Sequence, residues 1–400
     1  MPPSLSEPSI DPERSGWFND PDYFAVLARL RGESPVHRYA PGSWVVAGYD
    51  DVREVSRDTA RFCSGKGVLM DDPLRQGMEL PGSILHMDPP EHAQWRKVAS
   101  RWFTPRAVAG LEGRIRELAS ELLDGVDPTA DIDAVEALAA PLPIAVIAEM
   151  LGVDVADRDR FRHWSDALIE SPDGDGAGLD EITRMERTAE LLGFLDDQVT
   201  ERRAEPRDDL LSVLIAAEVD GRALEDHEVV MYALSMLVAG NETTRHVISG
   251  SLAALAEHAD QRATLIAEPL LMADAVEECL RWITPIQLFA RTALADTELG
   301  GQAIAEGDWV VMLYASANRD EAVWGESAGA FDARREPNPA HVAFGFGEHL
   351  CLGAGLARLE ARVFLDELLA RHPRYELAGD PTWTKSLLVR GMATLPVRLG

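Results

Sequence analysis

The 400-residue sequence contains little cysteine, and its three cysteines, Cys63, Cys279 and Cys351, lie far apart along the chain. Three scattered thiols are too few for a disulfide framework, which fits a protein of the reducing cytoplasm. The start of the sequence lacks a basic segment followed by an apolar one, so no signal peptide is expected. No apolar run reaches the roughly 18–20 residues that a membrane span needs. These absences predict a soluble, cytoplasmic protein.

Positive charge is also scarce, because 38 lysines and arginines face 68 acidic residues and leave a net charge of −30. Such a charge argues against nucleic acid as a partner. The local exception is residues 94–106, which contain Arg96, Lys97, Arg101 and Arg106 and no acid. This stretch predicts a basic patch that steers the docking of an acidic protein. For any one of these residues, a solvated helix face is an equally good interpretation.

The sequence shows no linker rich in proline, glycine or serine, no low-complexity tract and no internal repeat. One domain covering residues 1–400 is therefore expected, although the length alone would allow two or three. Strand patterns occur only in short pieces, such as residues 43–47 and 309–313, and helical patterns dominate elsewhere. The predicted fold class is mainly α with small β-sheets.

Three longer segments stand out along the chain. Residues 64–90 are rich in glycine, proline and methionine and predict a long irregular loop, which in a compact domain is usually functional or disordered. Residues 171–178 predict a flexible break between helices, either a lid hinge or an ordinary exposed connection. Residues 225–258 form the longest helical pattern, and residues 229–240 within it are apolar almost all round, which predicts burial at the centre of the molecule.

The most informative residues that the sequence does contain surround Cys351. Residues 344–353 read FGFGEHLCLG, and a helical pattern follows at residues 356–361. The N-terminus of a helix favours a thiolate, and glycines let the backbone turn tightly around a bound group. One thiolate cannot form a zinc or iron–sulfur site without partners, but it suffices as an axial ligand of haem iron. From the residues alone, a glycine-rich turn around a structural cysteine is the alternative.

The run resembles the haem-binding loop of the cytochrome P-450 family, Phe-Gly-x-Gly-x-His/Arg-x-Cys-x-Gly, at every fixed position. With three further motifs in the family's order, the resemblance covers nearly the whole chain. It implies one large cytochrome P-450 fold, with haem b (iron protoporphyrin IX) between a long central helix and the loop of the cysteine ligand. It also implies that Cys351 binds the metal of a haem-thiolate monooxygenase, which inserts one atom of dioxygen into a C–H bond.

A second motif, AGNETT at residues 239–244, lies inside the long helical pattern. Its glycine and threonines predict a local distortion of the helix. An acid beside an alcohol suits proton delivery, whereas ordinary polar residues of a buried helix are the alternative. The segment resembles the family's Ala-Gly-x-Asp/Glu-Thr. That resemblance implies a catalytic pair in which Glu242 relays protons and Thr243 handles them beside dioxygen, with Thr244 a weaker candidate.

A third motif places Glu278 and Arg281 three residues apart on one helical face, which taken alone is a common surface pair. It resembles the family's Glu-x-x-Arg, and the resemblance implies a buried structural pair behind the haem. The usual third member is an arginine after a Phe-Asp dipeptide. Of the two arginines that follow this dipeptide here, Arg335 fits the spacing better than Arg334.

The fourth group of residues matches positions that bind the haem propionates in the resembled family. His92 and Arg96 lie at i,i+4 on one helix, Arg291 follows the Glu-x-x-Arg helix, and His349 precedes Cys351 by two residues. Each of them taken singly would be interpreted as a solvated surface residue. Together they form the predicted cofactor-binding set, in which the two arginines are the stronger candidates because a guanidinium can bind a carboxylate with two hydrogen bonds.

The resemblance also implies a substrate pocket on the distal side of the haem. Its predicted residues are Val68, Leu69, Leu237, Ala239, Gly240, Ile286, Leu288 and Leu387. Their apolar character indicates a hydrophobic substrate, although core packing gives the same composition. Residues 281–285 and 291–297 look most like those of bacterial terpene, steroid and branched-lipid hydroxylases, an analogy that sets only an expectation.

No flavin or nicotinamide fingerprint is apparent, so electrons are expected from a separate protein. A ferredoxin is predicted to dock near Arg96, Lys97, Arg101 and Arg358. Two alternatives stay open. A peroxide-driven or reductive haem-thiolate enzyme is disfavoured by the acid–alcohol pair, because peroxide brings its own protons. A non-catalytic haem or ligand-binding protein is disfavoured because no output domain is attached.

Overall fold

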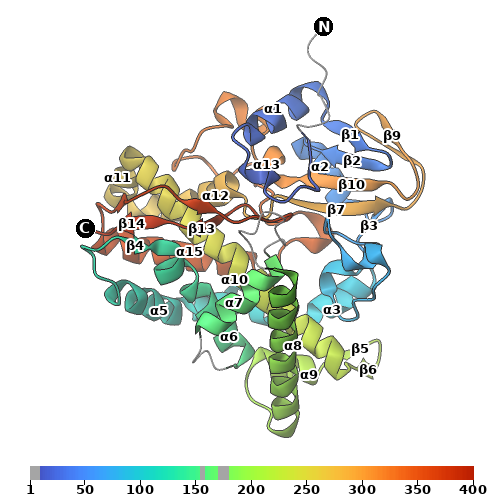
Figure 1. Ribbon diagram of the computed structural model, residues 1–400, viewed down its shortest axis with the longest axis horizontal. Coiled ribbons are helices and arrows are strands. Elements are labelled where there is room, and N and C mark those ends of the chain that lie inside the picture. Colours follow the sequence, from blue (N-terminus) through green and yellow to red (C-terminus); the bar gives the residue numbers. More distant parts are fainter. Residues whose placement is uncertain (1–9, 154–157, 170–179) are drawn as a thin grey trace.

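The computed structural model describes residues 10–153, 158–169 and 180–400 (Figure 1). The hinge expected at residues 171–178 lies outside these ranges. Helices form most of the described chain, as the sequence predicts. They are α1 (Tyr23–Glu33), α2 (Tyr49–Arg57), α3 (Glu91–Ser100), α4 (Pro105–Gly110), α5 (Glu112–Asp124), α6 (Pro141–Leu151), α7 (Arg158–Ile169), α8 (Glu181–Ala204), α9 (Leu210–Ile215), α10 (Asp226–Glu257), α11 (Ala259–Ala267), α12 (Met272–Ile283), α13 (Tyr314–Ala317), α14 (Glu321–Trp324) and α15 (Ala354–Arg371). Within the described ranges, no helix is long and apolar enough to span a membrane.

The strands are short and form several small sheets. They are β1 (Val36–Ala40), β2 (Ser43–Val46), β3 (Phe62–Cys63), β4 (Ile132–Asp133), β5 (Glu218–Val219), β6 (Arg222–Ala223), β7 (Leu288–Ala293), β8 (Thr297–Leu299), β9 (Gln302–Ile304), β10 (Trp309–Leu313), β11 (Glu376–Leu377), β12 (Thr382–Trp383), β13 (Met392–Thr394) and β14 (Pro396–Arg398). The largest sheet of the described chain has the order β1-β2-β10-β7-β3 and lies at one end of the molecule (Figure 1).

The largest sheet is built around β10, which pairs in parallel with β2 and antiparallel with β7. Alternate residues of β10 face opposite sides, as the pleat of a strand requires. Val311 packs in the cluster that α1 covers, whereas Val310 packs with residues of α2. The antiparallel pairing of β3 with β7 sets Cys63 opposite Thr292. The sheet therefore brings the start of the 64–90 loop next to Arg291 on β7.

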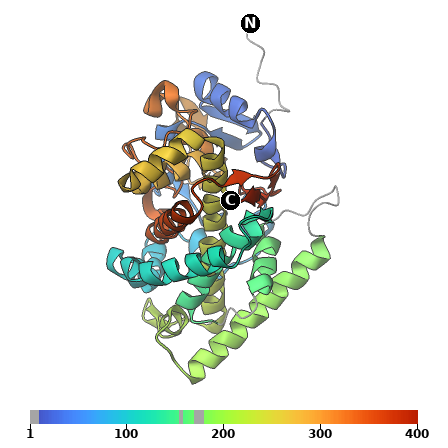
Figure 2. The same ribbon diagram turned by 90° about the vertical axis from the view of Figure 1, so that its left-hand side faces the viewer.

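The long helix predicted at residues 225–258 is α10, which runs through the middle of the helical part (Figures 1 and 2). A reciprocal cap starts it, because the Glu225 N–H donates to the Glu228 carboxylate (2.9 Å) while the Glu225 side chain caps the first turn. Acidic residues at this end also suit the positive end of the helix dipole. α10 contacts α6, α8, α12 and α15, and its apolar residues contribute to two hydrophobic clusters.

Two expectations for α10 differ from the structure. The helix is continuous from Asp226 to Glu257 instead of distorted at the AGNETT segment, and the Thr243 hydroxyl donates to the Ala239 carbonyl within it (2.8 Å). Burial is also not complete all round, because Ala239 is exposed while Gly240 and Thr243 are only half-buried. Since these residues lie in the middle of a central helix, one side of α10 borders an accessible space inside the protein.

Candidate active site

The Cys351 loop, residues 342–353, is held in shape by its own backbone. Gly345 and Gly347 have φ values of +70° and +75°, which favour glycine. A Cβ on Gly347 would also lie 2.6 Å from the carbonyl oxygen of Ser56, so the loop packs closely against the end of α2. The N–H of Cys351 donates to the carbonyl of Phe344 (2.9 Å). The cysteine is therefore fixed by backbone geometry just ahead of α15.

Cys351 has solvent-accessible surface, yet many protein atoms surround its thiol. The residue is exposed, yet burial raises the pKa of its thiol. The N–H of Gly353 and the positive charges of Arg96 and Arg358 lower this pKa but do not outweigh burial. The expectation that the loop favours the thiolate is thus met only in part. Because burial favours the neutral thiol, coordination of a metal cation would be what stabilises the thiolate here.

Next to the Cys351 loop lies a cluster of hydrogen-bond donors. The rings of His92 and His349 stack with centroids 4.1 Å apart, and the Nε2 atom of His349 lies 3.1 Å from the Ser64 hydroxyl. Burial, followed by the positive charges of Arg291 and His92, lowers the pKa of His349 to about 3. The Nδ1 atom of His92 is buried without a hydrogen-bond partner among the described residues.

Arg291 completes this cluster from β7. It is 4% exposed, and its guanidinium donates to the Ala290 carbonyl (2.8 Å). Across the described ranges, neither Arg291 nor Arg96 forms an ion pair with a carboxylate, although burial lowers the pKa of Arg291. A buried guanidinium without a carboxylate partner, with a second guanidinium and two imidazole rings near it, fits an anionic ligand. The structure thus gathers the four predicted propionate-binding residues beside Cys351, and this donor set fits haem, whose iron takes a thiolate and whose propionates take cationic donors.

The predicted acid Glu242 is fully buried and belongs to an ion network between two helices. Its Oε2 atom lies 2.5 Å from Nη2 of Arg245, and Arg245 Nη1 donates to Asp166 on α7 (2.8 Å). A parallel hydrogen bond joins Asn241 to Ser165 on α7 (2.8 Å). The side chain of Asp166 is 20% exposed, so this network, Asp166–Arg245–Glu242, reaches from the surface of α7 to the residue beside Thr243.

Sequence reasoning did not single out His246, which shares the face of Glu242 on α10. Its Nε2 atom lies 3.9 Å from Oε2 of Glu242, and burial, followed by the charge of Arg245, holds its pKa well below the ordinary value. A Cβ on Gly391 would overlap the His246 ring, so the ring lies directly against the backbone there. The i,i+4 spacing from Glu242 was available in the sequence, but the contact with Gly391 depends on tertiary packing.

The predicted structural group behind the Cys351 loop is brought together completely. Arg281 bonds both oxygens of the buried Glu278 (2.6 and 2.7 Å), and Arg335 donates to the same carboxylate (3.0 Å). Arg281 also donates to main-chain carbonyls at 318, 328 and 330. Arg334 instead pairs with the exposed Glu268. Of the two candidate arginines, Arg335 is the one that completes the group, called the brace below.

The predicted substrate-pocket residues fall into two groups in the structure. Three are buried: Val68, Leu237 and Leu288. Five keep accessible surface, with Gly240 also packed against Ile147 of α6: Leu69, Ala239, Gly240, Ile286 and Leu387. Leu288 packs with the cluster that α1 covers, on the far side of the sheet. Leu288 begins β7, where neighbouring residues face opposite sides of the sheet, and this places its side chain on the α1 side.

The predicted basic patch is partly rearranged. A surface hollow beside the Cys351 loop is lined by Arg57, Arg96, Lys97 and the 45%-exposed Leu350, among others. Arg358, expected in this patch, is bound by Glu277 (2.5 Å) and stacks over the Phe344 ring.

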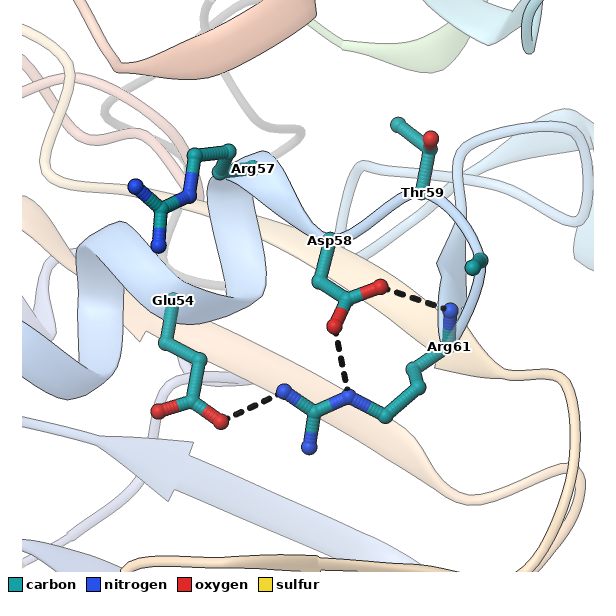
Figure 3. Close-up of a pocket in the computed structure, with 6 residues that line it drawn as sticks. Glu54, Arg57, Asp58, Thr59 and Arg61 are labelled. Atoms are coloured by element: carbon teal, nitrogen blue, oxygen red, sulfur yellow. Dashed lines mark hydrogen bonds and ion pairs between the residues drawn. The ribbon is translucent and has the colours of Figure 1, made fainter.

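Arg57 was missed because it lies in a different segment, at the end of α2. In Figure 3 its neighbour Arg61 is bonded by Glu54 and Asp58, whereas no interaction is drawn to Arg57. The hollow therefore presents three cations, Arg57, Arg96 and Lys97, together with one acid, Glu348, and the exposed Leu350.

Comparison with known proteins agrees with this geometry. The family model described as Cytochrome P-450 matches residues 183–378. The chain is 37% identical to a steroid C26-monooxygenase of Mycobacterium tuberculosis over 98% of this chain and 97% of the relative. It is 36% identical to a methyl-branched lipid omega-hydroxylase of Mycobacterium bovis, over 95% of this chain and 92% of the relative.

The fold has the same relatives. A cytochrome P-450 of Bacillus megaterium solved in complex with testosterone superposes with a TM-score of 0.85 at 34% identity, covering 94% of this chain and 97% of that chain. That family implies haem with a cysteine thiolate ligand, in agreement with the donor set beside Cys351. The chain belongs to the cytochrome P-450 family and is a monooxygenase of that family.

Proposed function

We propose that residues 1–400 form one haem-thiolate domain in which Cys351 is the axial ligand of haem b. When bound, the haem supplies the oxygen-activating iron centre, and the thiolate ligand favours O–O cleavage. His92, Arg96, Arg291 and His349 hold the propionates. The observation that carries this proposal is the gathering of these four donors beside an exposed thiol whose pKa is raised by burial.

Glu242 and Thr243 handle the protons of the reaction. One oxygen atom enters a C–H bond and the other leaves as water, which consumes two electrons and two protons. The Thr243 hydroxyl donates its own hydrogen to the Ala239 carbonyl (2.8 Å), so its oxygen is left to accept a hydrogen bond from the accessible side of α10. Glu242, buried and paired with Arg245, holds the acid function one residue away.

The substrate is a hydrophobic small molecule of the terpenoid, steroid or lipid class. The accessible predicted residues Leu69, Ala239, Ile286 and Leu387 are all apolar. The names of two relatives specify a steroid and a methyl-branched lipid, which supports this range. Optical titration of the ferric protein with testosterone, a monoterpene and a methyl-branched fatty acid distinguishes the three, because a substrate that displaces iron-bound water shifts the Soret band.

Electrons come from a ferredoxin that docks over the hollow beside the Cys351 loop. Arg57, Arg96 and Lys97 line the hollow with the exposed Leu350 and outnumber its one acid, Glu348, and the exposed Arg101 lies on the same segment as Lys97. Cations around an apolar centre suit an acidic partner, since charge steers the encounter and the leucine is buried on contact. Arg358 contributes less because Glu277 binds it.

The central experiment replaces the proposed ligand. Cys351→His should abolish the red-shifted Soret band that the reduced carbon monoxide complex of a thiolate-ligated haem shows. The matched control is Cys279→Ala, a buried cysteine on α12, which should keep the band. The ligand assignment is contradicted if both variants keep the band, or if only the control loses it.

A second experiment separates the oxygen-driven reaction from peroxide-driven chemistry. Thr243→Ala should retain the haem and its thiolate band but divert reducing equivalents to hydrogen peroxide, because proton handling is impaired. The ratio of product to NADH consumed, in a reconstituted ferredoxin chain, measures this diversion. Full turnover of the unaltered protein on hydrogen peroxide alone favours the peroxide-driven alternative.

A further inference from the structure

The loop of residues 64–88 is tied across by two carboxylates. Asp88 accepts hydrogen bonds from the backbone N–H groups of Ser64 (2.7 Å) and of residue 65 (2.9 Å), which closes the base of the loop. Asp72 is 1% exposed and accepts from the N–H groups of Val68 (2.7 Å) and Leu69 (3.0 Å). Burial opposes the charge on Asp72, but its hydrogen bonds outweigh burial and lower its pKa to about 2.

His86 joins this inner carboxylate to the far half of the loop. Its Nε2 atom lies 2.9 Å from Oδ2 of Asp72, and its Nδ1 atom lies 2.8 Å from the Ser83 hydroxyl. Because an ionised carboxylate only accepts, Nε2 carries a hydrogen, and in the neutral ring Nδ1 accepts from Ser83. The His86 side chain is 7% exposed and uses both ring nitrogens. Asp72, His86 and Ser83 are called the clasp.

The loop contacts the three elements that carry the candidate site. The carbonyl of Val68 accepts from the N–H of Ala290 on β7 (2.8 Å), next to Arg291. Gly82 packs against the backbone of Glu228 in α10, since a Cβ there would lie 2.7 Å from the Glu228 carbonyl oxygen. The Ser64 hydroxyl meets His349 of the Cys351 loop. A loop that bridges β7, α10 and the Cys351 loop bounds the space between them.

We propose that His86 is a positioning residue that keeps this loop closed over the site and thereby sets how readily small molecules reach it. The proposal rests on the proposed function, because it takes the bounded space to be the site of the reaction. Without His86, Asp72 keeps its bonds to the amides of Val68 and Leu69, but the segment around Ser83 loses its link to them. The loop then opens more often, while β7 and the Cys351 loop keep their own bonds.

The first test measures hydrogen–deuterium exchange of the haem-bound protein. His86→Ala should speed exchange in peptides covering residues 66–88 on the order of tenfold, as expected for the loss of a buried charge-assisted hydrogen bond. His86→Gln should restore slow exchange, because its amide can donate to Asp72 and accept from Ser83. The control His227→Ala removes a histidine whose side chain is 55% exposed and should change nothing in this loop.

Two results would overturn the proposal. Unchanged exchange of residues 66–88 in His86→Ala would show that the clasp does not hold the loop. An equal increase in α15 would show that His86 contributes only to general stability.

The second test uses carbon monoxide as the probe of access. After flash photolysis of the reduced complex, His86→Ala should rebind carbon monoxide from solvent severalfold faster, with Ser83→Ala in between and His86→Gln close to the unaltered protein. Equal rates in all variants would contradict the proposal. The thiolate band, recorded in the same samples, tests the proposed function separately. Its absence from the unaltered protein would contradict the ligand assignment. Hydrogen exchange would still test whether the clasp holds the loop.

Discussion

The two loops that meet at Ser64 and His349 are held by different kinds of interaction. The Cys351 loop is fixed by backbone hydrogen bonds and two positive-φ glycines, and Asn318 links it to the brace by accepting from the N–H of Val342 and from Arg281. The loop of residues 64–88 depends on the side chains of Asp72, His86 and Asp88. Backbone geometry holds Cys351 in one place, whereas a few side-chain bonds can be broken and remade. The difference suits the two proposed roles, a metal ligand that stays fixed and a cover that opens.

The largest expected effect on this comparison comes from breaking the brace. Glu278→Gln leaves the buried guanidinium of Arg281 without its carboxylate, which should lower the free energy of unfolding by about 3–5 kcal/mol. Urea unfolding followed by circular dichroism measures this loss. The control Glu268→Gln breaks the exposed pair with Arg334 and should cost about 0–1 kcal/mol. Similar losses in the two variants would contradict a buried, stabilising brace.

A second effect on stability depends on pH and comes from Glu360 on α15, the helix that follows the Cys351 loop. Burial raises the pKa of Glu360 from 4.5 to about 8. The folded protein therefore favours the neutral acid, and the stability that this preference gives is complete below pH 4.5 and is lost as the pH rises to about 8. Glu360→Gln cannot ionise, so it should be more stable than the unaltered protein at pH 8, by up to about 4 kcal/mol, and within about 1 kcal/mol of it at pH 5. Equal urea midpoint differences at both pH values would contradict this pKa.

A smaller effect is expected at the base of the 64–88 loop. Asp88→Asn keeps one accepting oxygen but loses the charge that binds two N–H groups, which should cost about 1–2 kcal/mol locally. Hydrogen exchange at residues 62–67 should quicken, whereas exchange in the Cys351 loop should stay slow. Faster exchange in both loops would show that their stabilities are not separate.

The smallest effect concerns the hollow where the electron donor is proposed to dock. Lys97→Gln and Arg57→Gln should each slow reduction by a ferredoxin a few-fold, because exposed charges are worth about 0.2–1 kcal/mol. The effect should fade in high salt, since salt screens exposed charges. Arg358→Gln is the matched control, because Glu277 already neutralises that arginine. Slowing that persists in high salt would contradict an electrostatic role.

The sequence predicted what is local in this molecule. The strands around Trp44 and Val310 and the long α10 follow from hydrophobic patterns, and the Cys351 run carries its own glycines and helix start. Within the brace, Arg281 lies one helical turn from Glu278, but Arg335 was reached only through the family resemblance.

The sequence could not give contacts that depend on how distant elements pack. Asp166 meets Arg245 across 79 positions, and the clasp has no motif at all. The sequence predicts that Arg358 is a free cation of the docking patch. The structure pairs it with Glu277, which lies 81 positions away. Which apolar residues line the pocket also depends on the side of each strand that faces it, as Leu288 shows.

The ion network Asp166–Arg245–Glu242 links the position of α7 on α10 to the charge of Glu242. If Glu242 takes up a proton, Arg245 loses the charge beside it and depends more on Asp166, so α7 is held more tightly to α10. If α7 moves away with Asp166, the positive charge of Arg245 favours the ionised Glu242. Because thermodynamic linkage is reciprocal, both statements describe the same coupling free energy. A movement of α7 relative to α10 would therefore change the charge that surrounds the acid beside Thr243.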